Sequence, residues 1–426
     1  MTAPETAPLR PGPTIGVRWA ALVFLSLAMF GNYYVYDSIA PIADLLKSQL
    51  GFTDENIGSL YTVYSIAALL TLLAGGFIID RIGTKKSTFI FGVICLAGGV
   101  LTAVSPELKF MLAGRLVLGL GAESLIVAVT TALAKWFKGK ELGLAFGVNL
   151  TIARLASVAA DNSPTWAGAY YDSWKGPLVI SAIISAFCVV GAGMYWLIEN
   201  YAEQRYQLGE AGSTDRVVFG DIFKFSYSYW LIVGLCITFY SAIFPFRSFA
   251  IKFFIEAHGT SREFGGFLNS VLPLSAMVAT PLFGLLVDKV GRRSLFMAVG
   301  SLMLLPVYLM MAYSQVSLYV PISMMGIAFS LIPAVMWPSV AYIVEQNKLG
   351  TAYALMTLIQ QIGLAAMNWG IGRANDVAGA SASHPAGYNP GMWIFSVLGF
   401  LGLFFSYLLW KSETGPKAHG LETIRA

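Results

Sequence analysis

The sequence predicts an all-α membrane protein in which twelve transmembrane helices form two six-helix bundles. The chain is 57% hydrophobic and only 12% charged, and a soluble domain of 426 residues needs more charge on its surface. Apolar stretches long enough to cross the roughly 30 Å hydrocarbon layer as helices recur along the whole chain. In addition, motifs of the first half return in the second half. These observations predict a duplicated multi-pass protein.

The predicted spans are separated by short loops and one longer polar stretch. They cover residues 19–45, 56–80, 87–105, 108–135, 142–170, 177–198, 227–257, 264–288, 294–314, 317–344, 350–374 and 390–410. The polar stretch divides them six and six, which predicts an N-terminal bundle (1–198), an inter-bundle linker (199–226) and a C-terminal bundle (227–426). The polar start leads directly into a full-length span, so no cleavable signal peptide is expected.

Lysines and arginines predict the orientation of the spans. Most of those in short loops and tails fall on one side, together with both termini and the linker. The other side holds only Lys47, Lys109, Lys175, Lys252, Arg262 and Arg373. The richer side is predicted to be cytoplasmic.

Several classes of protein are disfavoured. Cys95, Cys188 and Cys236 lie in apolar runs at unrelated positions, which suits neither a disulfide framework nor a metal site. The chain has no phosphate-binding GxxxxGK[ST] loop, so ATP is not expected as the energy source. Neither a catalytic constellation nor a basic-aromatic patch is recognisable. We therefore expect no enzyme, no cofactor, no metal and no nucleic-acid partner.

Two charges interrupt the fourth and fifth spans. Glu123 falls near the middle of 108–135, and Arg154 near the middle of 142–170. The short basic linker between these spans makes them antiparallel, so the two residues share one depth. A charge at the bilayer centre costs about 2.5–3.5 kcal/mol, and such residues usually face a cavity and pair. We predict a substrate site with an acid and a base, which could pair directly or through water when the site is empty; the alternative is a structural ion pair that locks two helices.

The internal repeat supports a site that is not symmetric. Asp80 and Asp288 lie 208 positions apart (288 − 80), in the related stretches GGFIIDRIGTKK and FGLLVDKVGRR. A second pair of stretches gives an offset of 207 (349 − 142). This offset maps Arg154 onto Gln361 and Glu123 onto Ser330, so the second half has neutral polar groups where the first has charges. Repeats of this kind place substrate between the two bundles.

Further candidates come from polar and aromatic residues within spans. In the first span Tyr33, Tyr36 and Asp37 fall on one helical face, and Asp37 is a second candidate for ligand or proton. In the seventh, Tyr240 and Arg247 flank Phe-Pro-Phe, where the proline frees backbone groups and a gate could bend. The full set of predicted substrate-binding residues is Glu123, Arg154, Tyr33, Tyr36, Asp37, Tyr240, Arg247, Asn269, Trp337, Gln360 and Gln361. Arg115 is expected to snorkel to the outer interface and is left out of this set.

A loop motif follows the second span and is repeated after the eighth. The first copy, Gly76-x-x-x-Asp80-Arg81-x-Gly83, resembles the signature of the major facilitator superfamily, and the second contains Asp288-Lys289-x-Gly291-Arg292. The glycines allow a sharp turn, and the aspartates can accept bonds from a neighbouring helix N-terminus. We predict a conformational latch that holds in one state and breaks in the other.

A closer resemblance covers nearly the whole chain. The stretches GRLVLGLGAESL, WFKGKELGLAFG, IARLAS, WPSVAYIV and LGTAYALM, with YVYD and FPF, resemble the lysosomal dipeptide carriers of the major facilitator domain-containing family. The resemblance implies a dipeptide uniporter in which Arg154 binds the ligand carboxylate and Glu123 its ammonium group. The first-span ExxER motif of the proton-coupled peptide carriers is absent. The alternatives are a carrier of another small zwitterion or organic anion, possibly proton-coupled, and a sensor that does not transport.

Two features depart from the animal carriers of this family. Arg247 adds a charge that the family pattern does not lead one to expect. The only glycosylation sequon, Asn149-Leu-Thr151, lies inside a span, and the N-terminal tail has no acidic dileucine. We therefore expect a bacterial-type plasma-membrane protein with a small-molecule substrate and no obligatory protein partner.

Overall fold

The computed structural model describes residues 11–137, 139–209, 219–416 and 418–425, and helices dominate the first three of these ranges. The first bundle contains α1 (Ile15–Asp37), α3 (Asp54–Ile82), α4 (Thr84–Val104), α5 (Leu108–Phe137), α6 (Leu142–Asp161) and α8 (Lys175–Arg205). The second contains α9 (Tyr227–His258), α10 (Arg262–Val290), α11 (Arg293–Tyr313), α12 (Tyr319–Ile343), α13 (Leu349–Val377) and α14 (Asn389–Glu413). Eleven helices of the described chain are long and apolar enough to cross a membrane, and α3, bent by 49°, is the twelfth if its two arms form one span.

Most predicted spans agree with these helices to within a few residues, but two end earlier than expected. The first was predicted to reach residue 45, whereas α1 ends at Asp37 and a short helix, α2 (Ala43–Leu50), follows. The fifth was predicted to reach residue 170, whereas α6 ends at Asp161 before α7 (Ser163–Trp166). Pro41 and Pro164 stand at the starts of the new turns. Proline is favoured in the first turn of a helix, where its missing N–H costs nothing, and hydropathy alone does not show the break because the sequence stays apolar.

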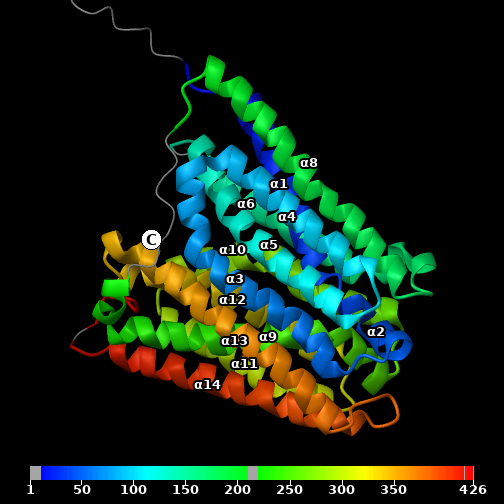
Figure 1. Cartoon of the computed structure of the whole chain (residues 1–426). Helices are drawn as coiled ribbons and strands as arrows, with labels where there is room; N and C mark the ends of the chain where they lie inside the picture. The colour runs from blue at the N-terminus through cyan, green and yellow to red at the C-terminus, as the bar shows by residue number, and fades with distance from the viewer. Residues whose placement is uncertain (1–10, 138, 210–218, 417, 426) are drawn as a thin grey trace, which may run out of the picture.

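The two bundles meet like the arms of a V (Figure 1). We call the side on which α1 begins and α14 ends the terminal face, and the side on which α1 and α9 end the far face. Figure 1 shows the bundles close together at the far face and apart at the terminal face. Helix α3 packs on α13 and α6 packs on α10, and these two contacts join the bundles.

Glycines allow the closest approach between the bundles. A methyl group added at Gly266 of α10 would lie 2.1 Å from the Asp161 carbonyl oxygen of α6. At the contact between α3 and α13, a methyl group added at Gly58 would lie 2.2 Å from the Asn368 carbonyl oxygen. Any larger side chain would push the helices apart, so glycine is required for the closed far face.

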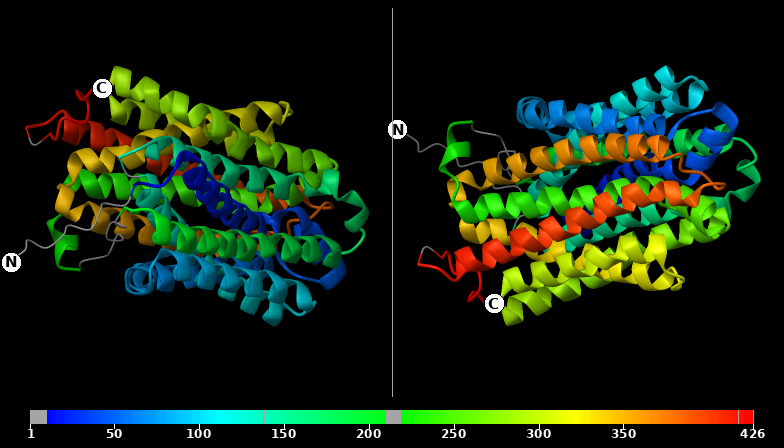
Figure 2. Two further views of the ribbon diagram at one scale, coloured as in Figure 1. Left: turned by 90° about the horizontal axis from the view of Figure 1, so that it is seen from above. Right: turned by 90° about the horizontal axis from the view of Figure 1, so that it is seen from below.

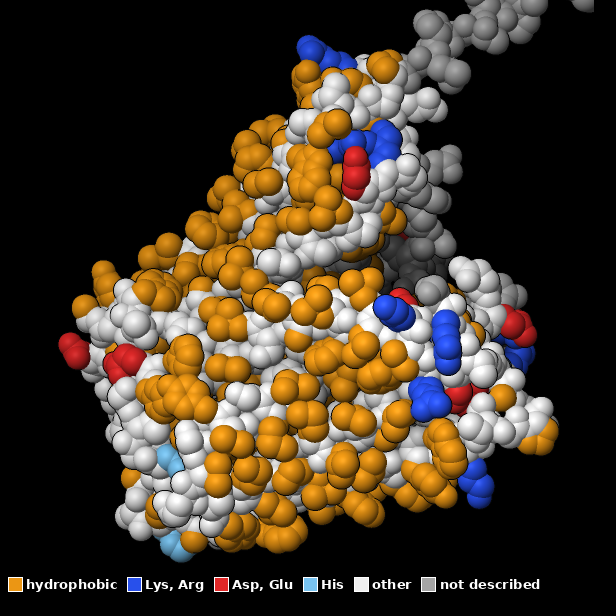
Figure 3. All heavy atoms as spheres, turned by 180° about the vertical axis from the view of Figure 1, so that it is seen from behind, with side chains coloured by type: hydrophobic (Ala, Val, Ile, Leu, Met, Phe, Trp, Pro, Cys, Tyr) orange, Lys and Arg blue, Asp and Glu red, His pale blue; other side chains and the backbone are white. Residues whose placement is uncertain are grey.

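The outside of the protein suits a hydrocarbon environment. Figure 3 shows apolar side chains over most of the visible face, with lysines and arginines gathered at one end beside a hollow between the bundles. Large apolar side chains such as Leu285, Val278 and Phe400 are more than half exposed. Such a surface is that of a membrane-embedded protein.

Candidate functional site

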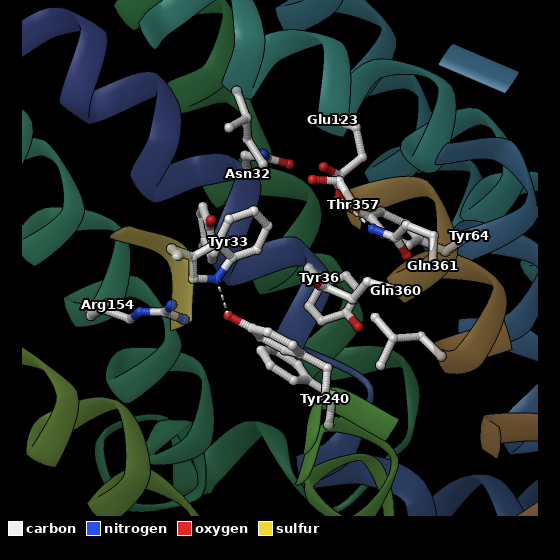
Figure 4. A pocket seen from close by; sticks show the side chains of 14 residues that line it. Asn32, Tyr33, Tyr36, Tyr64, Glu123, Arg154, Tyr240, Thr357, Gln360 and Gln361 are labelled. Atoms are coloured by element: carbon white, nitrogen blue, oxygen red, sulfur yellow. Dashed lines mark hydrogen bonds between the residues drawn. The ribbon is translucent and has the colours of Figure 1, made fainter. Parts of the chain in front are cut away.

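A cavity of about 320 Å³ lies between the two bundles (Figure 4). Its walls come from helices of both bundles: Asn32, Tyr33, Tyr36, Tyr64, Glu123, Ile126, Arg154, Tyr240, Phe244, Trp337, Thr357, Gln360, Gln361 and Leu364. Eight of the eleven residues predicted to bind substrate are among them. Tyr64 and Thr357 were not predicted from the sequence, because a single tyrosine or threonine in an apolar helix is more often a packing residue.

Glu123 provides the negative charge of the cavity. Its carboxylate accepts a hydrogen bond from the Tyr64 hydroxyl at 3.2 Å and one from the Gln361 amide at 3.1 Å. Gln361 belongs to the other bundle, so this second bond crosses the bundle interface. Neutral donors thus satisfy the carboxylate without neutralising its charge.

Arg154 provides the positive charge and lies on the opposite side of the cavity (Figure 4). Its guanidinium group stands 5.9 Å from the Tyr33 ring centroid and 5.6 Å from that of Phe329, distances typical of cation–π contacts. In the described part of the chain it forms neither a hydrogen bond nor an ion pair. Glu123 and Arg154 therefore form no direct ion pair among the described residues in this conformation, and a structural ion pair that locks α5 to α6 is not present there.

Aromatic rings form the rest of the wall. The rings of Tyr36 and Tyr64 meet edge to face at 4.7 Å between centroids. The Trp337 indole nitrogen donates to the Tyr240 hydroxyl at 2.9 Å, and Tyr240 stacks on Phe244. These rings offer apolar area together with hydroxyl groups, which suits a small ligand with charged ends and a variable middle.

Three predicted site residues lie elsewhere. Arg247 of α9 donates to Asp161 of α6 at 2.8 Å and lies 3.6 Å from Asp37 of α1. Asn269 of α10 donates to the same Asp161 carboxylate at 2.7 Å. Asp37, Arg247 and Asn269 thus line no part of the cavity but join the bundles in a buried polar cluster. Asp161 was missed because the predicted fifth span ran past it, which hid its place at a helix end.

A second polar cluster closes the far face. Lys252 of α9 is fully buried and lies 2.9 Å from the Asp54 carboxylate of α3. Its ammonium group also donates to Glu256 at 3.1 Å and to the Tyr388 hydroxyl at 2.6 Å. The Asp376 carboxylate of α13 accepts the backbone N–H groups of Asp54 at 2.9 Å and of Glu55 at 2.7 Å, where the dipole of α3 favours an anion.

The repeated loops have the expected turns. Gly83 and Gly291 both have positive φ, at 83° and 73°, which explains the glycines. Asp288, in the last turn of α10, accepts a bond at 2.9 Å from the side chain of Arg293, the first residue of α11. Asp80 and Arg81 lie at the exposed end of α3. Whether these loops act as a latch remains a prediction.

Arg115 does not snorkel to the interface as expected. It is fully buried, and its guanidinium group donates to the carbonyl oxygens of Val35 at 3.0 Å and Tyr36 at 3.1 Å. It also faces the rings of Tyr36, Tyr61 and Tyr64. Satisfied backbone acceptors and three aromatic faces make burial possible, so Arg115 ties α5 to the end of α1.

Sequence comparison identifies the family. The model of the major facilitator superfamily matches residues 25–368 and 248–423. The chain belongs to the major facilitator superfamily. Its twelve helices in two bundles are therefore the fold of a membrane transporter family, and this indicates a carrier and not an enzyme.

Among superfamily members, the chain is 34% identical over 376 residues to the lysosomal dipeptide transporter MFSD1 of zebrafish (Danio rerio), covering 85% of this chain and 81% of that protein. Solved superfamily structures share the fold at low identity. The nucleoside transporter NupG aligns with a TM-score of 0.74 at 12% identity, over 92% of this chain and 99% of that chain. A bacterial homologue of the human lysosomal transporter Spinster, inward-facing and unoccupied, aligns with a TM-score of 0.72 at 15% identity, over 94% and 98%.

Proposed function

We propose that this protein is an alternating-access carrier of dipeptides. One observation carries the proposal: Glu123 and Arg154 stand on opposite sides of one cavity without pairing with each other. Opposite charges held apart in a membrane protein are costly, and a ligand with two charged ends can neutralise both. The zebrafish relative, a dipeptide transporter by name, supports this choice of zwitterion.

In the proposed complex, the ligand carboxylate binds Arg154, whose planar fork matches a carboxylate with two parallel hydrogen bonds. The ammonium end binds Glu123 in place of the Gln361 amide. A dipeptide places its two charges up to about 7 Å apart, whereas a single amino acid carries both on one α-carbon. Because Glu123 and Arg154 stand on opposite sides of the cavity, we expect dipeptides to bind better than single amino acids. The aromatic wall accepts the side chains.

The same geometry supports an assignment of the conformation. The far face is closed by the Lys252–Asp54 and Arg247–Asp161 pairs, while the bundles diverge toward the terminal face. We infer that the terminal face is cytoplasmic, because most loop lysines and arginines lie there. The cavity then faces the cytoplasm, and transport requires the far-face contacts to break as the bundles rock about the ligand.

We further propose uniport at a plasma membrane. The chain lacks the first-span ExxER motif of the proton-coupled peptide carriers. The sequon asparagine, Asn149, is buried in α6 and accepts a hydrogen bond from Ser26 at 3.1 Å, so it offers no site for the glycosylation found on lysosomal proteins.

The test is ligand-induced thermal stabilisation of the purified protein with a dipeptide library. Wild-type protein should respond to dipeptides and not to single amino acids. Arg154→Ala should stay folded but lose the response, and Arg154→Lys should recover little, because an ammonium group is not a fork. Arg205→Ala, which removes an exposed arginine at the end of α8, is the control and should respond like wild type. A full response from Arg154→Ala, or an equal response to organic anions, would contradict the proposal.

A further inference from the structure

A second cavity lies away from the bundle interface, between α11 and α14 at the terminal face. These two helices pack side by side (Figures 1 and 2). The cavity measures about 500 Å³, which exceeds the central one. We call it the α11–α14 groove; its lining includes Arg292, Ser294, Leu295, Tyr407, Trp410 and Glu422.

The middle of the groove faces the membrane. Leu295 is 48% exposed, Tyr407 54% and Trp410 46%, so these side chains line a channel that opens sideways and not into the central site. Tyr407 and Trp410 lie near the end of α14, and tyrosine and tryptophan are enriched where the hydrocarbon layer meets the headgroups. The groove therefore offers an acyl chain an apolar path and presents its polar end to the headgroup layer.

The polar end holds one base, one acid and one unsatisfied hydroxyl. Arg292 is exposed beside the groove and makes no side-chain hydrogen bond or ion pair with any described residue. The hydroxyl of Ser294, in the first turn of α11, is fully buried and has no hydrogen-bond partner among the residues described. Glu422 uses one carboxylate oxygen to accept the Ser294 N–H at 3.0 Å, and its other oxygen stays unbonded within the described chain.

The C-terminal segment that carries Glu422 is firmly attached. Leu421 is fully buried, and the Arg292 N–H donates to the Glu422 carbonyl oxygen at 3.1 Å. The Glu413 carboxylate, at the end of α14, accepts the His419 N–H at 2.9 Å. These bonds hold Glu422 against the start of α11, so its carboxylate has a defined position at the end of the groove.

We propose that the α11–α14 groove binds a phospholipid with a primary-amine zwitterionic headgroup, phosphatidylethanolamine, from the terminal-face leaflet. Its phosphate binds the Arg292 guanidinium group and the Ser294 hydroxyl, which supplies the missing partner. Its ammonium group donates to the free oxygen of Glu422. A choline headgroup has no N–H to donate, and an anionic phosphatidylglycerol leaves Glu422 without a cation, so charge complementarity selects the amine lipid.

The experiment is native mass spectrometry of the full chain in detergent, with palmitoyl-oleoyl phosphatidylethanolamine, phosphatidylcholine and phosphatidylglycerol offered at equal concentrations. Wild-type protein should retain the ethanolamine lipid about tenfold better than the choline lipid, the difference expected from one hydrogen bond to a charged group. Glu422→Gln should remove this preference while binding both lipids weakly. Arg292→Gln should reduce binding of both, and Arg205→Gln, the control at the same face, should match wild type.

A further variant tests whether the acyl chain of the lipid lies in the apolar part of the groove. Ala298→Trp fills the apolar part of the groove and leaves Arg292, Ser294 and Glu422 in place, so it should abolish retention of all three lipids. Circular dichroism and size-exclusion chromatography verify that each variant is folded. Equal retention of ethanolamine and choline lipids by wild type, or an unchanged ethanolamine preference in Glu422→Gln, would refute the proposal. Because no dipeptide is present, the result does not depend on the transport function.

Discussion

Replacing Asp54 by asparagine should weaken the closed far face without unfolding the protein. The Asp54 side chain, on α3, is fully buried and lies 2.9 Å from the Lys252 ammonium group of α9. It also accepts hydrogen bonds from Lys47 at 3.2 Å and from Asn375 of α13 at 3.0 Å. The change keeps the size and one acceptor oxygen but removes the negative charge that crosses the bundle interface.

The free-energy cost of Asp54→Asn depends on the hydrogen bonds and the counterion that Lys252 retains. Glu256 is four residues further along α9 and still accepts from Lys252 at 3.1 Å, so the buried ammonium group retains a counterion within its own bundle. The loss is therefore that of a charged hydrogen bond, about 1.5–3 kcal/mol, and not the larger cost of an unpaired buried charge. In the outward-open state Asp54 faces water, so the substitution costs little there. The closed-to-open ratio should fall about ten- to a hundredfold.

Distances between spin labels at the far face measure this ratio. Ser48→Cys and Ser383→Cys place one label on each bundle at exposed positions, and Cys95, Cys188 and Cys236 are buried and so poorly accessible to label. Asp54→Asn should add a longer-distance population. Glu256→Gln is the matched control: it removes the other carboxylate from the same lysine but within one bundle, so it should not open the far face. A distance distribution for Asp54→Asn identical to wild type, or the same opening in Glu256→Gln, would refute this reasoning.

Three further predictions concern the interface, the ligand and the energetics of transport. Gly372→Ala should also open the far face, because its methyl group would lie 2.3 Å from the Asp54 carbonyl oxygen, whereas Gly370→Ala on the same helix meets nothing within 4 Å and should match wild type in the spin-label assay. N-acetylation of the dipeptide should weaken binding as much as Glu123→Gln does, and the two together should cost little more than either alone in thermal-shift titrations, since both delete one interaction; additive losses would place the ammonium group elsewhere. In proteoliposomes a dipeptide gradient alone should drive uptake to equilibrium, and an imposed proton gradient should not concentrate a net-neutral dipeptide; accumulation that a protonophore abolishes and that Asp37→Asn lacks would overturn uniport.

The sequence alone predicted the fold well, because the bilayer restricts what a chain can do. Each span must be helical and apolar over a nearly constant length, so a count of apolar stretches approximates a count of helices. The predicted span 227–257 and the observed α9 (Tyr227–His258) differ by one residue. Glu123 and Arg154 were found for the same physical reason: charged residues within transmembrane helices are rare, and those present usually have a functional role.

The tertiary structure decided which charges pair, since this depends on contacts between helices far apart in the sequence. Arg247 and Asp161 are 86 positions apart, and Lys252 and Asp54 are 198 apart. The sequence around Arg247 does not indicate that α6 and α1 supply the carboxylates that face it. The sequence around Arg154 likewise does not indicate that aromatic rings, and not Glu123, lie beside its guanidinium group. Hydropathy reports how deep a residue lies along the membrane normal. Which side of its helix meets which partner is a matter of rotation and packing, and these depend on the whole assembly of twelve helices.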